Sequence, residues 1–381
     1  MRKILLIGGT GCLSTDIARK LSDSVEYELY MLNRGNQKER MPCNTNLIVA
    51  DIRQSDSCRK ILEGAYFDVV VDFISYTDKQ LQNTLDILEG HYKQFMFISS
   101  AAVYDINAIG QKKITEEAPI GNKEWWYSKG KIECEKFLAG YFSKRNEVYT
   151  IVRPFVTYNE ERLPYALAPG YHYTWTIIRR IMEEKPIVIW DEFNCVMPIT
   201  STLDFANGII ALFNNKKAYG NIFHIATEKV YSWKQIFDLV GSILNKTIYY
   251  VHIDNKKISS IFPEYEDTIT YDKCFDYYVD NSKIKAVCPE FYNLVDLEAG
   301  MKRMVSYHLK NAYAQKTDYM WDARMDMLID RYCYDNYPNI LDKSFYRLDK
   351  YHFSIKQKIK ILVFSNCWLY KAYKTLSSFV F

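Results

Sequence analysis

Residues 4–14 read ILLIGGTGCLS, and this stretch decides the fold of the 381-residue chain. Its first four residues are apolar and end at glycine, which is typical of a buried parallel strand. The glycines fit the pattern G-x-x-G-x-x-G with Ser14 in the third glycine place, and a helix is predicted from Cys12 to Leu21. Glycine permits a tight turn and a close approach of the backbone to a phosphate, while the helix N-terminus attracts the anion. The motif therefore predicts a dinucleotide site, with a purely structural glycine turn as the alternative.

Strand and helix patterns alternate over the first 150 residues. This alternation predicts an α/β fold with a Rossmann-type, doubly wound parallel sheet. In such sheets ligands bind at the carboxyl ends of the strands, where Ser99-Ser100 and Arg153-Pro154 fall. Further strands are expected at Tyr27–Leu32, Leu47–Ala50, Phe67–Phe73, Phe95–Ile98 and Val148–Val152, and helices at Leu81–Leu88 and Glu124–Phe142.

The pattern loosens after about residue 155, which predicts a second and smaller part of the fold. We expect residues 1–155 to form the dinucleotide-binding domain, with residues 201–226 returning to it. Residues 156–200 and 227–309 would form a smaller α/β part that binds the substrate, and residues 310–381 a C-terminal extension of unknown role with a helical tail. Helices are expected at Thr174–Met182, Leu203–Phe213 and Ser232–Leu244, and strands at Asn221–Ile225 and Tyr249–Ile253.

Composition and charge exclude several classes of protein. Hydrophobic residues make up 48% of the chain and charged residues 25%, which is ordinary for a globular protein. The net charge of +3 is too small to indicate a nucleic-acid partner by itself. Nine cysteines without a Cys-x-x-Cys pair, and six histidines without metal spacing, predict free thiols in a reducing cytoplasm and no metal site. No segment has the roughly 18 apolar residues that a transmembrane helix needs.

The residues after the second and third strands bear on which dinucleotide binds. The second strand ends in Leu32-Asn33-Arg34-Gly35 and lacks the carboxylate that usually binds the ribose diol of NAD. Arg34 could pair with a 2′-phosphate, which slightly favours NADP, although an exposed arginine in a turn is an equal alternative. Asp51 could accept a hydrogen bond from the adenine amino group or cap a helix.

The segment Tyr127-Ser128-Lys129-Gly130-Lys131 places a phenol and an ammonium on one face of a helix. A phenol has a pKa near 10, too high for an efficient base at neutral pH, and a nearby ammonium and the nicotinamide cation would lower it. Lys131 could also hold the nicotinamide ribose, and Ser100 could orient or polarise the substrate oxygen. A Tyr-x-x-x-Lys string also arises by chance among 32 tyrosines, so its position after the glycine motif is what gives it weight.

Taken in order, these motifs resemble those of the extended short-chain dehydrogenase/reductase superfamily, in its NAD-dependent epimerase/dehydratase group. The resemblance covers roughly residues 1–305 and implies that Ser100, Tyr127 and Lys131 are the catalytic triad. The matching segments are Gly8–Leu13, Asp51-Ile52, Phe97–Tyr104, Tyr127–Lys131, Arg153-Pro154 and Ser201–Ala206. The cofactor-binding residues would be Gly8, Thr10, Gly11, Cys12, Leu13, Asn33, Arg34, Asp51, Ile52, Phe73, Ile74, Lys131 and Pro154.

Residues that differ from the sequence pattern of this group limit the reactions that the chain is expected to catalyse. Ala101-Ala102 stand where dehydratases of this group carry Asp-Glu, which disfavours elimination of water and suits a 4-epimerase or a simple ketoreductase. Val156 stands where epimerases usually carry an asparagine that contacts the substrate, and this weakens the assignment to sugar nucleotides. Weaker substrate contacts are expected from Ala101, Trp126, His172 and Trp175, with a hydrophobic helix start as the alternative for the last two.

The resemblance implies an NAD- or NADP-dependent epimerase or reductase that acts on a nucleotide-activated sugar, as a cytoplasmic homodimer. The alternative is a catalytically silent scaffold of the same fold that senses a dinucleotide or binds RNA. The intact set of Ser100, Tyr127 and Lys131 argues against that alternative, and so does the weak basic balance of the chain.

The tail from Ile355 to Leu376 alternates lysines with apolar and aromatic residues. It is predicted to form a basic amphipathic helix, which could make peripheral contact with a membrane surface. We favour packing on the body of the protein or on a dimer mate.

Overall fold

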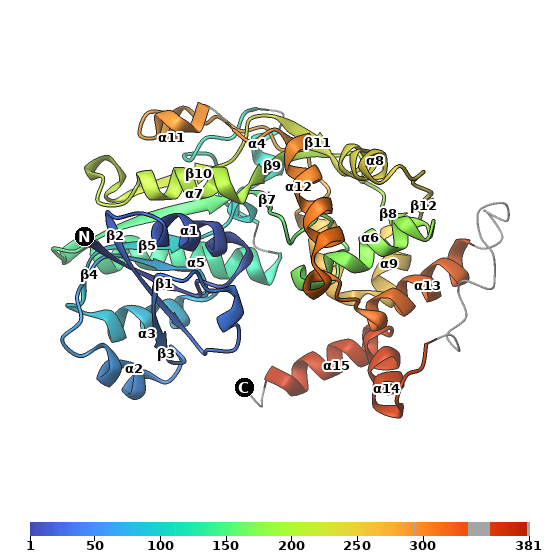
Figure 1. The fold of residues 1–381 in the computed structure, drawn as a ribbon, viewed down its shortest axis with the longest axis horizontal. Coiled ribbons are helices and arrows are strands. Elements are labelled where there is room, and N and C mark those ends of the chain that lie inside the picture. Colours follow the sequence, from blue (N-terminus) through green and yellow to red (C-terminus); the bar gives the residue numbers. More distant parts are fainter. Residues whose placement is uncertain (111, 123, 293, 334–350, 379–381) are drawn as a thin grey trace. The chain divides into compact units, whose positions relative to one another are not determined.

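The computed structural model describes residues 1–110, 112–122, 124–292, 294–333 and 351–378, which form two compact units (Figure 1). The first unit comprises Met1–Asn159, Met197–Val230 and Tyr277–Leu297. The second comprises Glu160–Val196, Tyr231–Asp276 and Glu298–Phe381. The assignment of cofactor and substrate binding to separate parts of the chain stays a prediction.

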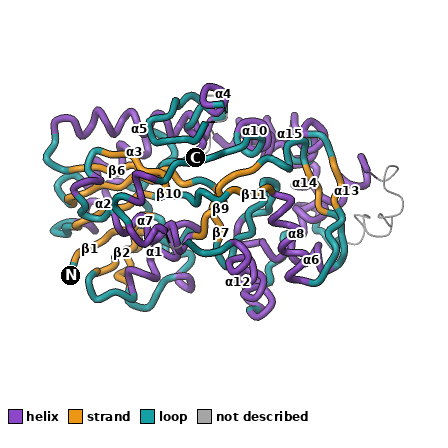
Figure 2. The backbone as a smooth tube through the Cα atoms, turned by 90° about the horizontal axis from the view of Figure 1, so that it is seen from above, coloured by secondary structure: helices purple, strands orange, loops and turns teal. Residues whose placement is uncertain are grey.

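The first unit is built on a seven-stranded sheet with the order β10-β6-β5-β4-β1-β2-β3, and its strand pairs are parallel. This confirms the predicted Rossmann-type α/β fold, and the strands lie side by side in Figure 2. The strands are β1 (Arg2–Ile7), β2 (Tyr27–Asn33), β3 (Thr45–Val49), β4 (Phe67–Asp72), β5 (Tyr92–Ile98), β6 (Val148–Pro154) and β10 (Asn221–Ile225).

Helices cover both faces of this sheet because the side chains of each strand alternate between its faces. In β1, Ile4 and Leu6 pack with one set of helices, and Leu5 and Ile7 with the other. The first set is α1 (Cys12–Ser22) and α7 (Thr202–Ala211); the second is α2 (Ser55–Leu62), α3 (Asp78–Leu88) and α5 (Trp126–Tyr141). This unit also holds α4 (Ile106–Ile109), α11 (Ser282–Lys285), β7 (Val156–Tyr158) and most of β9 (Val196–Ser201).

The strand order reverses between β1 and β4, and this fixes where a ligand can bind. From β1 the chain continues outward through β2 and β3 and then returns to the other side of β1 as β4. Ile7 pairs with Leu32 of β2 and with Asp72 of β4, so the carboxyl ends of these three strands are level. Ligands of doubly wound sheets bind in the crevice at such a switch point.

The second unit is mainly helical around an aromatic core. Trp190, buried completely, lies 5.5 Å from the Trp233 ring and 5.0 Å from the Phe193 ring. Its strands are β8 (Ile187–Ile189) and β12 (Tyr250–His252), with β11 (Val230–Ser232) at its border. Its helices are α6 (Thr174–Met182), α8 (Trp233–Leu244), α9 (Asn255–Ile261), α10 (Glu266–Tyr271), α12 (Leu297–Lys310), α13 (Tyr319–Cys333), α14 (Ile355–Phe364) and α15 (Cys367–Ser378).

Short 3₁₀ turns occur in both units. They are η1 (Lys38–Arg40), η2 (Ala101–Val103), η3 (Phe142–Lys144), η4 (Tyr171–Tyr173), η5 (Lys216–Ala218), η6 (Pro263–Tyr265), η7 (Pro289–Tyr292) and η8 (Ala312–Ala314).

The predicted tail helix is wrong in one respect, because the tail forms two helices, α14 and α15. The break falls at Ser365-Asn366, where the Asn366 Oδ1 accepts a hydrogen bond from the Leu369 N–H at 3.1 Å. An asparagine that bonds the backbone three residues ahead starts a new helix and competes with continuation of the old one. None of the helices in the described ranges combines the length and the apolar character that a bilayer-spanning helix requires.

Candidate active site

The glycine turn between β1 and α1 leaves no room for side chains. Gly8 has φ of 86°, which favours glycine, and its N–H donates to the Leu32 carbonyl at 3.2 Å. A Cβ on Gly8 would collide with Ile74 Cγ2, and one on Gly9 would lie 2.6 Å from Met31 Cε. A Cβ on Gly11 would meet only ordinary contacts. The turn therefore packs against the loop after β4 and opens on the side of Gly11.

Ser14, which replaces the third glycine of the motif, closes this turn. Its buried Oγ donates to the Gly8 carbonyl at 2.9 Å and accepts from the Gly11 N–H at 2.9 Å. Cys12 and Leu13 open helix α1, and the first N–H groups of a helix have no partner within it. The arrangement suits an anion at this helix N-terminus.

An amide and a carboxylate, those of Asn33 and Asp51, lie at the ends of β2 and β3. The Asn33 Oδ1 accepts from the Gly35 N–H at 2.8 Å, while its buried Nδ2 has no hydrogen-bond partner in the described part of the chain. Asp51 pairs with Arg53 at 2.6 Å, and this pairing holds the pKa of Asp51 below its usual value. Arg34 is exposed and its charge adds to that effect.

The loop after β4 is shaped by a carboxylate that the sequence analysis missed. Asp72 is fully buried and accepts from the N–H groups of Ile74 at 2.8 Å and Ser75 at 3.1 Å. The Ser75 hydroxyl donates to the second oxygen of Asp72 at 2.5 Å. These bonds fix the path of Phe73 and Ile74, which were predicted to flank the cofactor. Ile74 remains 37% exposed beside the glycine turn.

Lys131 of α5 reaches this same loop. Its Nζ donates to the carbonyls of Ser75 at 2.8 Å and Ile98 at 2.7 Å, and the side chain is 2% exposed. These bonds use two of the three N–H groups of the ammonium. Burial lowers the pKa of Lys131 to about 8, although the nearby charge of Asp72 opposes the shift. Lys131 therefore lies at the carboxyl ends of β4 and β5, where a cofactor is expected.

Tyr127 lies one helical turn before Lys131 in an aromatic setting. The Lys131 Nζ is 6.0 Å from the centre of the Tyr127 ring and 4.8 Å from the Tyr76 ring. The rings of Trp125 and Trp126 lie 5.0 Å and 6.0 Å from Tyr127. Trp126 is 55% exposed, so it does not anchor the helix in the core. The pair of tryptophans and Tyr76 thus surround the phenol.

The two serines after β5 have different environments. The buried Ser99 hydroxyl donates to Glu135 at 2.5 Å. The half-buried Ser100 hydroxyl accepts a local bond from the Ala102 N–H at 3.2 Å and has no other hydrogen bond among the described residues. Ser99 therefore belongs to the interior, and Ser100 is the hydroxyl that remains available to a ligand. Ala101 and Ala102 are buried in η2.

A buried ion pair supports the helix that carries Tyr127 and Lys131. Arg153 binds both carboxylate oxygens of Glu135, at 2.6 Å and 2.9 Å, and both side chains are at most 5% exposed. Sequence reasoning missed Glu135, although it follows Lys131 at the same spacing of four residues. Arg153 also donates to the Glu116 carbonyl at 3.0 Å. The ion pair therefore links α5 to β6 in the interior of the first unit.

His224 belongs to the same interior rather than to a reactive site. Its backbone N–H donates to a carboxylate oxygen of Glu116 at 3.1 Å, and its ring Nδ1 lies 3.3 Å from the Tyr104 hydroxyl. Burial lowers the pKa of His224. No cluster of metal-ligating side chains occurs among the residues that the structure describes.

The remaining predicted residues fall in two places. Ile52 is buried after β3, and Pro154 ends β6 opposite Ile225. His172 lies in η4 and Trp175 in the first turn of α6; both belong to the second unit and are half-buried. Their contact with a substrate stays a prediction.

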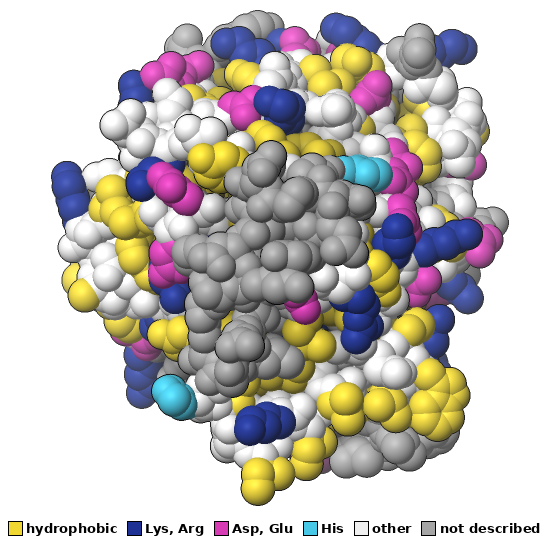
Figure 3. Space-filling view, turned by 90° about the vertical axis from the view of Figure 1, so that its right-hand side faces the viewer, with side chains coloured by type: hydrophobic (Ala, Val, Ile, Leu, Met, Phe, Trp, Pro, Cys, Tyr) yellow, Lys and Arg dark blue, Asp and Glu magenta, His cyan; other side chains and the backbone are white. Residues whose placement is uncertain are grey.

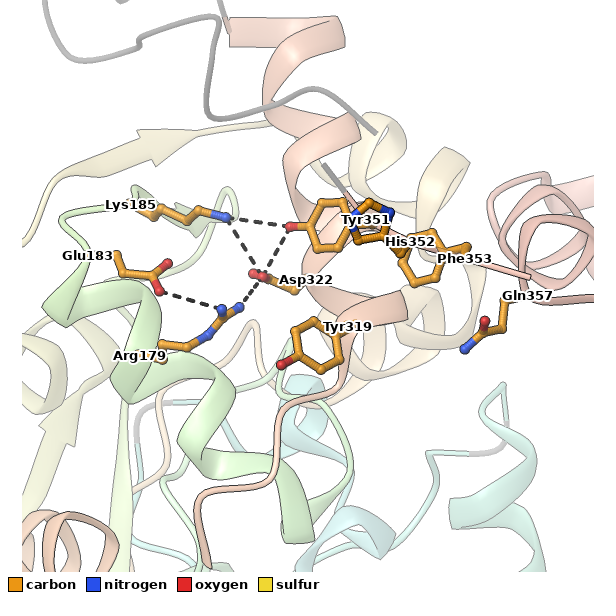
Figure 4. Close-up of a pocket in the computed structure, with 9 residues that line it drawn as sticks. All are labelled: Arg179, Glu183, Lys185, Tyr319, Asp322, Tyr351, His352, Phe353 and Gln357. Carbon is orange, nitrogen blue, oxygen red and sulfur yellow. Dashed lines mark hydrogen bonds and ion pairs between the residues drawn. The ribbon is translucent and has the colours of Figure 1, made fainter. Parts of the chain in front are cut away.

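The second unit contains a cavity of about 550 Å³, shown in Figure 4. Asp322 of α13 is fully buried and pairs with Arg179 and Arg180 of α6, each at 2.5 Å. Burial alone would raise the pKa of Asp322, but Arg180 and Lys185 hold it below its usual value. These pairs join α13 to α6, so the first part of the predicted extension belongs to the second unit. The lining residues are Arg179, Glu183, Lys185, Tyr319, Asp322, Tyr351, His352, Phe353 and Gln357.

Comparison with known sequences gives one match to a family. The sequence model of the NAD dependent epimerase/dehydratase family matches residues 4–226. No curated protein sequence shows significant similarity to the chain.

Several solved structures share the fold. A UDP-glucuronic acid 4-epimerase from Bacillus cereus, in complex with UDP-glucuronic acid and NAD, has a TM-score of 0.65 and 19% identity, covering 81% of this chain and 99% of its own. An epimerase from Methanothermobacter thermautotrophicus has a TM-score of 0.67 and 14% identity, covering 81% and 93%. A dTDP-glucose 4,6-dehydratase from Bacillus anthracis, in complex with NAD, has a TM-score of 0.64 and 17% identity, covering 82% and 97%. At these identities the likeness shows the fold alone.

Proposed function

Because the chain belongs to the NAD dependent epimerase/dehydratase family, in the extended short-chain dehydrogenase/reductase superfamily, we propose that it is an NAD-dependent epimerase of a nucleotide-activated sugar. The observation that carries the proposal is the position of Lys131. Its buried ammonium bonds the ends of β4 and β5 and lies one helical turn from Tyr127. A phenol, a buried ammonium and a serine hydroxyl at the end of the sheet where a dinucleotide would bind therefore support the proposal.

The residues around the switch point fit NAD. The turn at Gly8 and Gly9 excludes side chains, and the N-terminus of α1 would hold the pyrophosphate. The unpartnered Nδ2 of Asn33 would donate to the adenosine ribose, and Lys131 to the nicotinamide ribose through its third N–H. When bound, NAD would supply the nicotinamide that takes a hydride from the sugar and gives it back.

The protein's own residues would handle the proton. Tyr127 would remove the proton of the reacting sugar hydroxyl and later return it. The charge of Lys131 would favour the phenolate form of Tyr127, because an opposite charge nearby stabilises the ionised state. Ser100 would donate a hydrogen bond to the reacting oxygen and fix its position. Glu135 and Arg153 would act as positioning residues for α5.

Epimerisation is favoured over dehydration by Ala101 and Ala102. Elimination of water needs an acid and a base beside the catalytic hydroxyl, and two buried alanines supply neither. The structural neighbours include both reaction types, so this preference rests on these two side chains.

NAD rather than NADP is proposed. Two of the neighbours are complexes with NAD. Arg34, the residue that favoured NADP in the sequence, lies near enough to Asp51 to affect its ionisation. The negative charge of Asp51 would oppose a 2′-phosphate at this position. The B. cereus neighbour is a complex with UDP-glucuronic acid, which supports a nucleotide sugar as the substrate class.

Native mass spectrometry of the freshly purified protein tests the proposal. We expect tightly retained NAD, because an epimerase regenerates its cofactor without releasing it. An empty protein that binds NADPH reversibly would replace the proposal with a reductase. A protein that binds neither dinucleotide would contradict it and favour the catalytically silent scaffold.

A further inference from the structure

The last part of the chain concentrates positive charge. Residues 351–381 contain five lysines and neither aspartate nor glutamate. The whole chain has a formal net charge of +3, so the residues before 351 carry a net charge of −2. The basic character of the protein therefore resides in the segment that forms α14 and α15.

One side of these helices packs on the rest of the second unit. Ile361 is 5% exposed, and the Phe364 carbonyl accepts from Arg324 of α13 at 2.6 Å. Arg324 is in turn paired with Glu264 at 2.5 Å. Tyr370 of α15 is 9% exposed and lies against the Phe364 ring, with centres 5.6 Å apart. These contacts hold α14 and α15 against α13 and against each other.

The other side exposes large apolar residues. Ile355, Ile359 and Leu362 of α14 are 78%, 55% and 65% exposed, and their spacing of four and three residues places them on one helix face. Trp368 at the start of α15 is 76% exposed. Figure 3 shows hydrophobic side chains beside lysine or arginine side chains in the lower part of the view, at the height of α14 in Figure 1. The predicted packing of the tail on the body of the protein thus holds for one side of the helices, and packing on a dimer mate stays a prediction.

We propose that α14 and α15 dock the protein on the surface of an anionic lipid bilayer. The exposed apolar row of α14 is accompanied by Lys356, Lys358 and Lys360, all exposed. This combination of apolar side chains, tryptophan and lysine without acidic residues is typical of helices that lie in the bilayer interface. The lysine stems can cover apolar surface while their ammonium groups reach lipid phosphates. The cytoplasmic leaflet, on the side expected from the sequence, carries anionic lipid.

The helices can lie on a bilayer but not cross it. α14 has 10 residues, which span about 15 Å at 1.5 Å per residue, against a hydrocarbon core of about 30 Å. A lipid surface also suits these helices better than a second copy of the chain. A symmetric contact would bring the same lysines of two copies together, and like charges repel.

Vesicle flotation of the full chain tests this inference. We expect the protein to float with vesicles of phosphatidylcholine and phosphatidylglycerol at low salt, and not with phosphatidylcholine alone. The triple change Lys356→Gln, Lys358→Gln and Lys360→Gln should weaken binding about 100-fold, at roughly 1 kcal/mol per lysine. The double change Ile359→Ser and Leu362→Ser should weaken it at least about tenfold, because it removes the inserted apolar area.

A matched control variant loses the same number of positive charges as the α14 lysine variant, at a different place in the fold. The triple change Lys60→Gln, Lys216→Gln and Lys217→Gln neutralises three exposed lysines of the first unit and should leave flotation unchanged. Circular dichroism and thermal unfolding establish that each variant is folded. Three results would overturn the inference: no flotation of the unmodified chain with anionic vesicles, equal loss in the control, or a folded α14 variant that floats normally. Halving of the mass in solution by the α14 changes, without any vesicle binding, would assign the surface to a second copy instead.

Discussion

Lys131 is the residue whose state decides what the candidate site can do. It is buried at the ends of β4 and β5 and has two carbonyl partners. Burial lowers its pKa to about 8, so the side chain changes charge close to physiological pH. Below that pH it is an ammonium that can donate a third hydrogen bond and stabilise a phenolate. Above it the neutral amine does neither as well.

The affinity of nucleotide-free protein for NAD should therefore fall as the pH rises through about 8. A ribose that accepts from the ammonium raises the pKa of Lys131 in the complex, so the complex binds more protons than the free protein above pH 8. Linkage then predicts a loss of affinity of up to about tenfold per pH unit in that range. Calorimetric titration of stripped protein across the range measures it.

Two variants of α5 test whether the pH dependence of NAD affinity comes from Lys131. Lys131→Met should bind NAD weakly, with no pH dependence in this range. Lys129→Met changes an exposed lysine of the same helix and should keep the wild-type profile. A flat wild-type profile, or the same slope in Lys131→Met, would show that Lys131 does not contact the cofactor.

Among single residues, the sequence predicts those with a recognisable spacing and misses the buried carboxylates that position them. Tyr127 and Lys131 are separated by one helical turn, a local relation that the sequence displays. The roles of Asp72 and Glu135 depend on contacts with Ser75, Ser99 and Arg153, which the folded chain brings together. Ser99 and Ser100 are chemically identical; the family resemblance selects Ser100, and the burial of Ser99 agrees with that choice.

Helix α5 approaches the loop after β4 so closely that one position must be glycine. A Cβ on Gly130 would collide with the Tyr76 carbonyl oxygen. Gly130 lies beside Lys131, which bonds the same loop through the Ser75 carbonyl. The glycine therefore sets the distance between the helix and the loop that would border the cofactor.

Gly130→Ala should weaken NAD binding, because the loop must move away from Lys131. Overpacking costs about 1–3 kcal/mol, partly offset by about 1 kcal/mol of helix propensity. Gly140→Ala in the same helix is the control, since nothing lies within 4 Å of the added Cβ. It should raise the free energy of unfolding by up to about 1 kcal/mol and leave NAD binding unchanged. Denaturant unfolding and NAD titration check both, and equal NAD affinity in the two variants would contradict the close approach.

Elements were predictable where one strong local signal defines them. The strands of the sheet were found as short apolar runs, and the helix at Thr174–Met182 was found because its apolar residues recur at helical spacing. Helix α2 was missed, since only Cys58 and Leu62 of its eight residues are buried. The tail was predicted as one helix because its composition is uniform, whereas a single side-chain bond from Asn366 divides it.

At the scale of the whole molecule, the extension is part of the second unit rather than an appendage. Asp322 and Asp326 of α13 are fully buried and share Arg180 of α6, at 2.5 Å and 2.7 Å. Lys185 pairs with Asp326 at 2.9 Å. Such an arrangement depends on residues about 140 positions apart, so the sequence alone did not reveal it.

Asp322→Asn should loosen α13, because it leaves buried arginines with less compensating charge. Breaking a buried ion pair costs about 3 kcal/mol, which corresponds to roughly 100-fold faster amide hydrogen exchange in α13. Asp330→Asn, at an exposed position of the same helix, should leave exchange unchanged. Hydrogen-exchange mass spectrometry compares them. Unchanged protection of α13 in folded Asp322→Asn would show that the pairs do not hold the extension.

We propose that Tyr127 exchanges a proton with a nucleotide sugar while bound NAD accepts a hydride from it. The most direct measurement follows the near-ultraviolet absorbance of reduced nicotinamide after NAD-loaded protein is mixed with a panel of UDP-sugars. The control is Tyr141→Phe, on the same helix, whose hydroxyl has no hydrogen-bond partner in the described part of the chain. We expect one UDP-sugar to give a signal of equal rate in wild type and Tyr141→Phe. Tyr127→Phe should retain NAD but react about 100- to 10,000-fold more slowly. A Tyr127→Phe variant as fast as wild type would contradict the account.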